Sequence, residues 1–261
     1  MLPAADFAGH PFAGRSFQPN PFEGDTGEAD PAVATALHSF AEVRSTAHPD
    51  AIEQSFAELV SALQPARLLI PLVAEAGDYG VTEGGRVVEK SQELSIVHVE
   101  GPDGRAVAPV FSSVESLRVW NKDARPVPVA AARAALATAA EGLALLVLDP
   151  GSPHSVTLRR SALQAIATGE AYQSPLREKA VLDALAEGLE DFRSQVLSYE
   201  LHSGDPSRTM SGPEIIVALG LVPGLNPDDL GAMLATISAA WTSHPVLHQR
   251  VDGLGMKILA A

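Results

Sequence analysis

AVAPVFSSVESLRVWNKDARPVPV, residues 106–129, is the stretch of sequence that decides the fold of this chain. Its first apolar run predicts a strand over Val107–Phe111, and its last apolar run predicts a short strand around Val127–Val129. The polar, amphipathic segment between them predicts one or two helical turns that end near Trp120. A strand, a short helix and a second strand so close together favour a fold that mixes both kinds of element.

Two serines stand where this helix begins. Ser112 and Ser113 can each accept a hydrogen bond from the first free N–H groups of a helix. Ser112 has Glu115 three residues later, so we expect Ser112 to form a capping box. Leu117 and Trp120 then fall near one face of the helix. In a structural interpretation they fill a core, whereas in a functional one the serines and the tryptophan form a rim that grips a partner.

Strands are also predicted upstream of this stretch. Leu68–Val73 is a continuous apolar run, which is typical of a strand buried on both faces. Pro71 lies inside it and cannot donate to a ladder, so we expect this strand at a sheet edge or with a bulge. The turn Gly101-Pro102-Asp103-Gly104 joins a strand over Leu94–Val99 to the strand over Val107–Phe111, which makes a hairpin.

Downstream, Leu143–Leu148 and Val156–Leu158 predict two strands that pair across a tight turn. Within that turn, Asp149 and Gly151 have two interpretations. They could form a backbone nest that binds an anion, or they could belong to a plain turn.

The order of these elements predicts an α+β fold with two domains and an N-terminal extension. The N-terminal domain, residues 31–170, is expected to have a mixed or antiparallel sheet with packed helices. A linker over residues 171–175 leads to a smaller α+β sandwich domain over residues 176–261. Residues 1–30 predict a flexible acidic extension with Phe7, Phe12, Phe17 and Phe22, whose five-residue spacing fits neither a helix face nor a strand face.

Composition excludes several classes of function. The 261 residues carry 32 acids and 18 bases, a net charge of −14, which disfavours nucleic acid and anionic lipid as partners. The absence of cysteine excludes thiol catalysis and cysteine-bound metals. No run approaches the length of a membrane span and no signal peptide is visible, so we expect a cytoplasmic protein.

The sequence offers no catalytic residue, no cofactor site and no metal site with a strong motif. The common motifs of serine hydrolases, P-loop enzymes, zinc proteases and dinucleotide-binding domains are missing. His244 and His248 have a spacing that could bind a metal, although solvated histidines at a helix end explain them better. His202, Ser203 and Asp205 hold the residue types of a catalytic triad, but triads usually gather residues distant in sequence.

The stretch quoted first also resembles a known family. Pro109-Val110-Phe111-Ser112-Ser113, followed by Leu117 and Trp120, is similar to the P-x-F-[ST]-S…L…W pattern of the bacterial SseB family, named for enhanced serine sensitivity. Three further stretches agree in order: LLIPLV at 68–73, the strand at 94–99 with its turn, and LLVLDPG at 145–151 followed by Leu158-Arg159-Arg160. The acidic leader at 20–25 resembles the variant of the family with an N-terminal extension. The resemblance spans residues 20–169 and implies a C-terminal family domain behind it.

None of these shared motifs is catalytic, so the resemblance indicates the fold better than the function. We expect a non-enzymatic interaction or regulatory module whose partner is a protein or a second copy of the chain. The candidate binding residues are Phe111, Ser112, Ser113, Leu117, Trp120, Asp149 and Gly151. One alternative is a small-ligand-binding protein or an uncharted enzyme linked to amino-acid (serine) metabolism, and another is a self-assembling structural protein.

Overall fold

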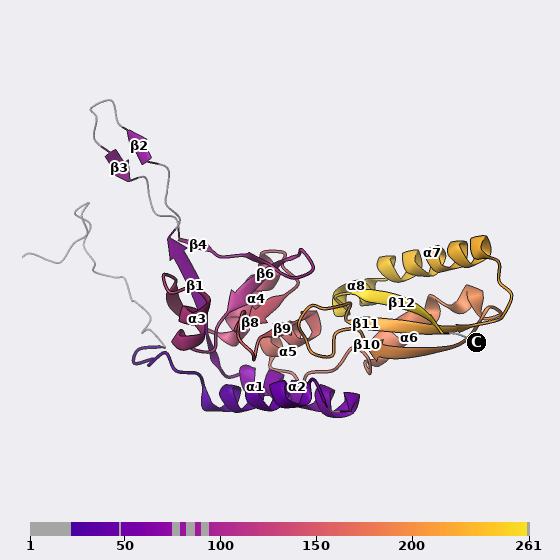
Figure 1. Ribbon diagram of the computed structural model, residues 1–261, viewed down its shortest axis with the longest axis horizontal. Coiled ribbons are helices and arrows are strands. Elements are labelled where there is room, and N and C mark those ends of the chain that lie inside the picture. Colours follow the sequence, from indigo (N-terminus) through magenta and orange to yellow (C-terminus); the bar gives the residue numbers. More distant parts are fainter. Residues whose placement is uncertain (1–21, 47, 75–78, 82–86, 90–93, 260–261) are drawn as a thin grey trace, which may run out of the picture.

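The computed structural model describes residues 22–46, 48–74, 79–81, 87–89 and 94–259 (Figure 1). Phe7, Phe12 and Phe17 of the predicted N-terminal extension lie outside the residues that the structure describes. Two helices come first, α1 (Pro31–Val43) and α2 (Pro49–Leu63). The strands and helices that follow are β1 (Arg67–Ala74), β2 (Tyr79–Val81), β3 (Val87–Glu89), β4 (Leu94–Ile96), β5 (Val99–Glu100), β6 (Ala106–Val110), α3 (Val114–Trp120), β7 (Arg125–Ala130), α4 (Ala131–Ala140), β8 (Leu146–Leu148), β9 (Val156–Leu158) and α5 (Arg160–Thr168).

The rest of the chain forms a second group of elements. These are α6 (Lys179–Glu187), the short 3-10 helix η1 (Glu190–Phe192), β10 (Val196–Ser203), β11 (Ile215–Leu221), α7 (Pro227–Ser243), α8 (Pro245–Arg250) and β12 (Leu254–Leu259). Figure 1 shows this group beside the first one, with α7 lying along its sheet.

Strand pairing confirms the expected α+β class. In the first group, β1 lies between β4 and β7 in one antiparallel sheet, and the order β5-β6-β8-β9 forms a second, mixed sheet. The N–H of Leu69 in β1 donates to the carbonyl of Phe111 at 2.8 Å, and the N–H of Phe111 returns a bond at 2.9 Å, so the two sheets are joined. The predicted hairpin across residues 101–104 is present, since β5 and β6 pair antiparallel. The strand expected over Leu94–Val99 is broken into β4 and β5.

The expectation for Pro71 was wrong. β1 is the middle strand of its sheet, and its register with β7 runs without a shift from Arg67 to Leu72. Because the Leu69 N–H points away from β7, the nitrogen of Pro71, two residues later, points the same way. The pairing with β4 starts only at Leu72, so Pro71 occupies a gap between that pairing and the bridge to Phe111. A proline is therefore tolerated in a middle strand because no neighbour needs its missing donor.

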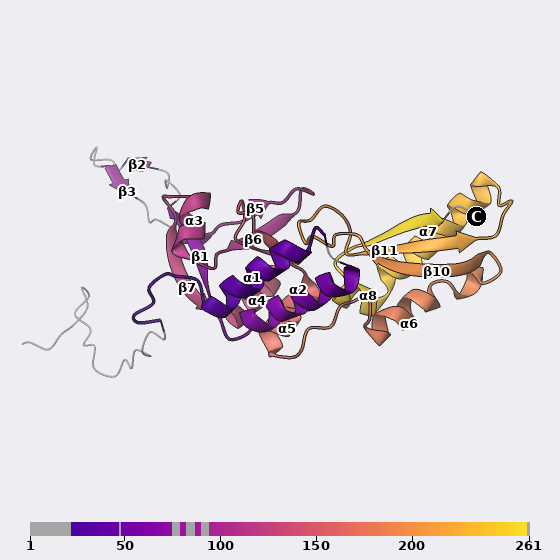
Figure 2. The same cartoon turned by 60° about the horizontal axis from the view of Figure 1, so that its bottom comes forward.

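Four helices cover one face of the first group of strands. Residues of α1, α2, α4 and α5 form, with Leu68, Val110 and Leu148, one large cluster that we call the N-terminal core. In Figure 2, α1 and α2 come forward side by side over this face. Successive strand residues face opposite sides, so Leu69 and Phe111 point into a separate cluster under α3.

The second group has its own core. We call it the C-terminal core; its buried members include Val181 and Leu185 of α6, Val217 of β11, and Ile237 and Trp241 of α7. All three strands of the sheet β10-β11-β12 present one face to these helices. The other face carries exposed polar side chains, as a small open-faced sandwich would. The division into domains at residues 31–170 and 176–261 stays a prediction.

Candidate interaction surface

Of the two serines that could start helix α3, the structure uses Ser113. Ser113 is the N-cap, with extended φ and ψ of −141° and 162°, and its Oγ accepts from the N–H of Ser116 at 3.0 Å. The capping box expected at Ser112 and Glu115 was therefore wrong. The hydroxyl of Ser112 is engaged elsewhere, by a carboxylate that is distant in sequence.

That carboxylate belongs to Asp149, at the end of β8. The N–H of Ser112 donates to Oδ1 of Asp149 at 2.8 Å, and its Oγ donates to Oδ2 at 2.6 Å. Asp149 is buried and has a left-handed φ of 49°, a conformation that aspartate tolerates better than most residues. Burial raises the pKa of Asp149, and the two hydrogen bonds from Ser112 offset part of that rise. The pair fixes the start of α3 to the second sheet.

The aromatic and apolar candidates lie inside the protein. Phe111 and Leu117 are completely buried in the cluster under α3. Trp120 is half-buried, and its ring centroid lies 5.3 Å from that of Phe111 in a tilted arrangement. These three side chains therefore hold α3 in place, and a partner would meet the helix mainly through its other face.

The base of the N-terminal leader packs against the start of α3. The N–H of Val114 donates to the carbonyl of Gly27 at 2.8 Å, and a Cβ added to Gly27 would lie 2.5 Å from a methyl group of Val114. Arg67 binds both segments: Nη2 contacts the Asp25 carboxylate at 2.5 Å, and Nη1 donates to the carbonyl of Ser112 at 2.9 Å. The structure thus places residues 25–28 of the leader directly beside the segment that begins α3.

A shallow pocket lies where these segments meet. Its lining comes from residues 26–29 and from the exposed side of α3, namely Ser113, Val114, Glu115, Arg118 and Val119. Val119 is 73% exposed, which is the largest exposure among the large hydrophobic side chains of the described residues. An exposed valine in the same pocket as an acid and a base offers a partner an apolar contact next to charged side chains.

Gly151 lies apart from this surface, in the turn between β8 and β9. It is exposed, has a φ of 80°, and has open space where a Cβ would stand. The N–H of Ser152 donates to the carbonyl of Asp149, and the Asp149 side chain points inward to Ser112. These contacts describe a turn whose acidic side chain is already engaged, and the anion nest stays a prediction.

A buried ionic network, which no motif in the sequence predicts, joins the two cores. The Arg159 guanidinium, 1% exposed, contacts Asp205 at 2.6 Å, Asp252 at 2.5 Å and the carbonyl of Gly212 at 3.0 Å. Arg105 reaches the same Asp252 carboxylate at 2.8 and 2.9 Å. The partners of Arg159 are 46 to 93 residues away in sequence, so no local sequence pattern predicts these contacts.

The loop between β10 and β11 carries the second half of this network. Arg208 is buried; its guanidinium contacts Glu53 of α2 at 2.6 Å and lies 4.4 Å from the ring centroid of Phe56. Glu214 accepts the N–H of Asp252 at 2.7 Å. Burial raises the pKa of Glu214, and that backbone bond and the charge of Arg208 offset part of the rise. The network thus locks the loop against both cores.

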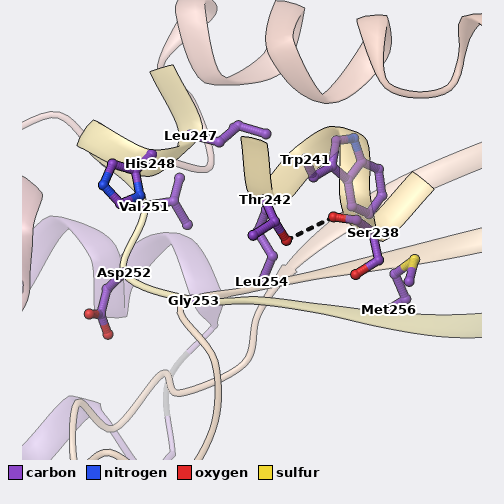
Figure 3. A pocket seen from close by; sticks show the side chains of 10 residues that line it. All are labelled: Ser238, Trp241, Thr242, Leu247, His248, Val251, Asp252, Gly253, Leu254 and Met256. Atoms are coloured by element: carbon purple, nitrogen blue, oxygen red, sulfur yellow. Dashed lines mark hydrogen bonds between the residues drawn. The ribbon is translucent and has the colours of Figure 1, made fainter. Parts of the chain in front are cut away.

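One pocket collects the residue types of a hydrolase without their geometry. Figure 3 shows Ser238, His248 and Asp252 among the side chains that line it, with Asp252 pointing away from the wall formed by Trp241 and Thr242. The Asp252 carboxylate is already bound by Arg105 and Arg159. The hydroxyl drawn with a dashed line is that of Thr242, which donates to the Ser238 carbonyl at 2.8 Å. No hydrogen bond within the described residues joins the serine, histidine and aspartate.

The triad types at His202, Ser203 and Asp205 are also kept apart. His202 contacts Glu200 at 3.3 Å on the polar face of the sheet, whereas Asp205 is bound to Arg159. His244 caps α8 and accepts from the N–H of Val246 at 3.3 Å. Across the part of the chain that the structure describes, no three His, Asp or Glu side chains are placed to hold a metal ion.

A polar pocket of about 730 Å³ lies beside α2 and bears on the small-ligand alternative. Tyr172, Ser174 and Glu53 line it, and each has one side-chain oxygen that is buried without a hydrogen-bond partner among the described residues. Burial raises the pKa of Tyr172 to about 12, so its hydroxyl stays neutral. At the rim, Arg177 is paired with Asp50. These buried oxygens are enclosed by neighbouring atoms, and the charged groups Asp50, Arg177 and Lys179 of the pocket are already in ion pairs.

Among the described residues, every helix is too short or too polar to cross a membrane. No curated protein and no solved structure matches the chain. A family model, described as the SseB protein N-terminal domain, matches residues 34–165, which is 132 of the 261 residues. The matched segment includes α3, its N-cap Ser113, and the pair Ser112 and Asp149. The chain therefore belongs to the SseB family.

Proposed function

We propose that this SseB family protein is a non-enzymatic interaction module, and that its partner protein binds the surface formed by residues 26–29 and the exposed side of α3. The observation that carries the proposal is the bond from the Val114 N–H to the Gly27 carbonyl at 2.8 Å, next to the exposed side chain of Val119. Because of that bond, residues 26–29 of the leader and the start of α3 form one continuous surface.

Rigid support is the first argument for this surface. Ser113 caps α3, the Asp149 carboxylate holds Ser112, and the Phe111 and Trp120 rings pack beneath the helix. Binding a preformed helix face costs less conformational entropy than ordering a loose segment. The buried motif residues thus support a binding role indirectly, by presenting the outer face of α3.

The chemistry of the surface is the second argument. Val119 supplies an apolar contact, while Glu115 and Arg118 carry opposite charges beside it. A partner with an apolar anchor and polar neighbours fits such a face, since interfaces combine an apolar centre with a polar rim. The net charge of −14 disfavours a nucleic acid in that place.

The proposal is tested by comparing two charge substitutions at exposed apolar residues. Val119→Asp alters the α3 surface, whereas Leu136→Asp alters α4, where Leu136 is 58% exposed. Each full-length variant is used for affinity purification from the native cell, and the captured proteins are quantified. A captured partner is then purified and its affinity for each variant is measured.

We expect Val119→Asp to weaken binding of the partner by about tenfold or more, and Leu136→Asp to leave it unchanged. Removing residues 1–21 from the parent chain tests whether the leader adds affinity. The proposal fails when Val119→Asp keeps every partner at the affinity of the parent protein. Trp120→Ala and Ser113→Ala serve as secondary variants, because both also weaken the support of α3.

A further inference from the structure

The outer strand β10 leaves one row of backbone groups without a partner strand. Within the described chain, β11 is the only strand that pairs with β10. The Gly204 N–H donates to the Glu214 carbonyl, and this pair continues the β10–β11 register. Even-numbered residues of β10 therefore bond to β11, so the N–H and C=O groups of Tyr199, Leu201 and Ser203 point away from the sheet.

The outer strands β7, β9 and β12 each have a feature that discourages pairing with a further strand. On β7, Pro126 and Pro128 remove the donors that would point outward. On β9, the Thr157 N–H donates to the carbonyl of Arg208. β12 carries an exposed Lys257. β10 reads VLSYELHS, without proline or lysine, and exposes Leu197 and Tyr199.

We propose that β10 pairs antiparallel with β10 of a second copy of this chain about a two-fold axis at Leu201, joining the two three-stranded sheets into one. A two-fold axis is the commonest symmetry of protein dimers, and it requires a surface that complements itself. This interface is independent of the α3 surface.

The register follows from the two faces of the sheet. To keep the apolar faces of the two sheets on the same side, the two-fold axis must pass through a residue of β10. An axis at Ser198 meets the register shift between Val196 and Ser198, and an axis at His202 leaves Tyr199 unpaired, so Tyr199, Glu200 and Leu201 are the positions to compare. A centre at Glu200 sets two carboxylates directly opposite each other, which is destabilising. If the axis passed through Tyr199, the hydrogen bonds between the two copies of β10 would extend into the register shift between Val196 and Ser198.

A centre at Leu201 satisfies both charge and hydrogen bonding. It sets Glu200 of each copy opposite His202 of the other, in the closely spaced, non-hydrogen-bonded pairs. An imidazole N–H can donate to a carboxylate in either protonation state. Leu201 then pairs with Leu201 of the second copy, and Tyr199 pairs with Ser203 of the second copy. The outward-pointing N–H and C=O groups of these three residues in each copy form roughly six backbone hydrogen bonds between the chains.

The test begins with the mass of the full-length protein, measured by sedimentation over about a hundredfold range of concentration. We expect the 27.2 kDa chain to form a dimer at the upper end. His202→Glu places four carboxylates at the axis and should raise the dimer Kd by about tenfold or more. Adding Glu200→Lys to it restores opposite charges and should restore the dimer.

Both side chains are exposed, His202 by 54% and Glu200 by 63%, so the fold should tolerate these changes. Lys257→Glu, on the same polar face but on β12, is the matched control and should leave the dimer intact. A monomer at every concentration overturns the proposal, and so does a dimer that His202→Glu leaves unchanged.

A cross-link tests the register separately. The chain has no cysteine, so Leu201→Cys introduces a single thiol. The Cα atoms of the two Leu201→Cys residues, one in each copy, would lie about 5.5 Å apart, which is within the range of a disulfide. Leu197→Cys, as control, would lie more than about 20 Å from its mate. Equal cross-linking of the two variants, or none at Leu201→Cys, overturns the register.

Discussion

Asp149 accepts two hydrogen bonds from Ser112, one from the backbone N–H at 2.8 Å and one from the hydroxyl at 2.6 Å. The two residues are 37 positions apart in sequence, and both are buried. Their contact couples the end of β8 to the segment that begins α3. Any function of the α3 surface therefore depends on a carboxylate that a partner does not touch.

Replacing Asp149 tests the strength of this support. Asp149→Ala leaves the N–H and hydroxyl of Ser112 buried without acceptors, and should lower the free energy of unfolding by about 3 kcal/mol. Asp149→Asn keeps an acceptor and tolerates a left-handed backbone, so it should cost about 1 kcal/mol. Urea unfolding measures both values. Asp149→Gly is the control for the φ of 49°: a stability equal to the parent would show that backbone strain, and not hydrogen bonding, dominates at this site.

The pH dependence of stability should have opposite signs at two acids of the ionic network. Burial alone would raise the pKa of Asp205, but bonds from Arg159 and the Thr209 N–H lower it below 3.8. The unfolded state then binds more protons, so this stabilisation is present above about pH 4 and is lost as the pH falls through the folded pKa. Burial raises the pKa of Glu214 above 4.5, so its contribution is lost as the pH rises through the folded value.

Two amide variants check these signs by urea unfolding between about pH 3 and pH 7. The cost of Asp205→Asn should shrink as the medium becomes acidic. Glu214→Gln should gain stability relative to the parent as the pH rises. The same pH trend in both variants would contradict the assignment.

Short-range signals in the sequence predicted much of the fold. Asn226 followed by Pro227 is a sequence pattern typical of a helix start, and α7 begins there with the Asn226 side chain accepting from the Asp229 N–H. Glycine is the residue most typical of a helix end, and Gly169 caps α5 with a left-handed φ of 74°. In both cases the residues that make the contact are neighbours in sequence, so the pattern contains the whole interaction.

Predictions failed where a distant residue decided the outcome. Ser112 has the spacing of a capping box, but Asp149 binds its hydroxyl and leaves Ser113 to cap the helix. Pro71 reads as an edge residue, yet β4 and the Phe111 bridge leave a gap that accommodates it. Arg159 was noticed only as part of a family stretch, because its carboxylate partners lie on loops 46 and 93 residues later.

Arg159 should matter for how the two cores unfold. Arg159→Met leaves the Asp205 and Asp252 carboxylates buried without this cation, and should cost about 3–5 kcal/mol. Adding Asp205→Asn should recover part of that loss. The neighbouring Arg160→Met is the control and should cost less than about 1 kcal/mol, since Arg160 is only partly buried.

The two tryptophans report on the two regions separately. Trp120 belongs to the cluster under α3, and Trp241 belongs to the C-terminal core. With either one replaced by Phe, the other reports its own region by fluorescence. We expect coincident urea transitions in the parent and separated ones in Arg159→Met. Coincident transitions in the variant would show that the network does not couple the cores.

Gly188 should be intolerant of a side chain because of Trp241. A Cβ at this position would lie 2.3 Å from the indole nitrogen, which donates to the Leu185 carbonyl at 3.1 Å. Gly188→Ala should therefore displace the ring, lower the free energy of unfolding by about 1–3 kcal/mol, and shift Trp241 fluorescence in a Trp120→Phe background.

Gly231, exposed in α7 with nothing within 4 Å of an added Cβ, is the matched control. Gly231→Ala should stabilise the protein by about 0.5–1 kcal/mol, because alanine loses less backbone entropy in a helix. Equal effects of the two substitutions would mean that helix propensity, and not contact with the indole, sets the cost at Gly188.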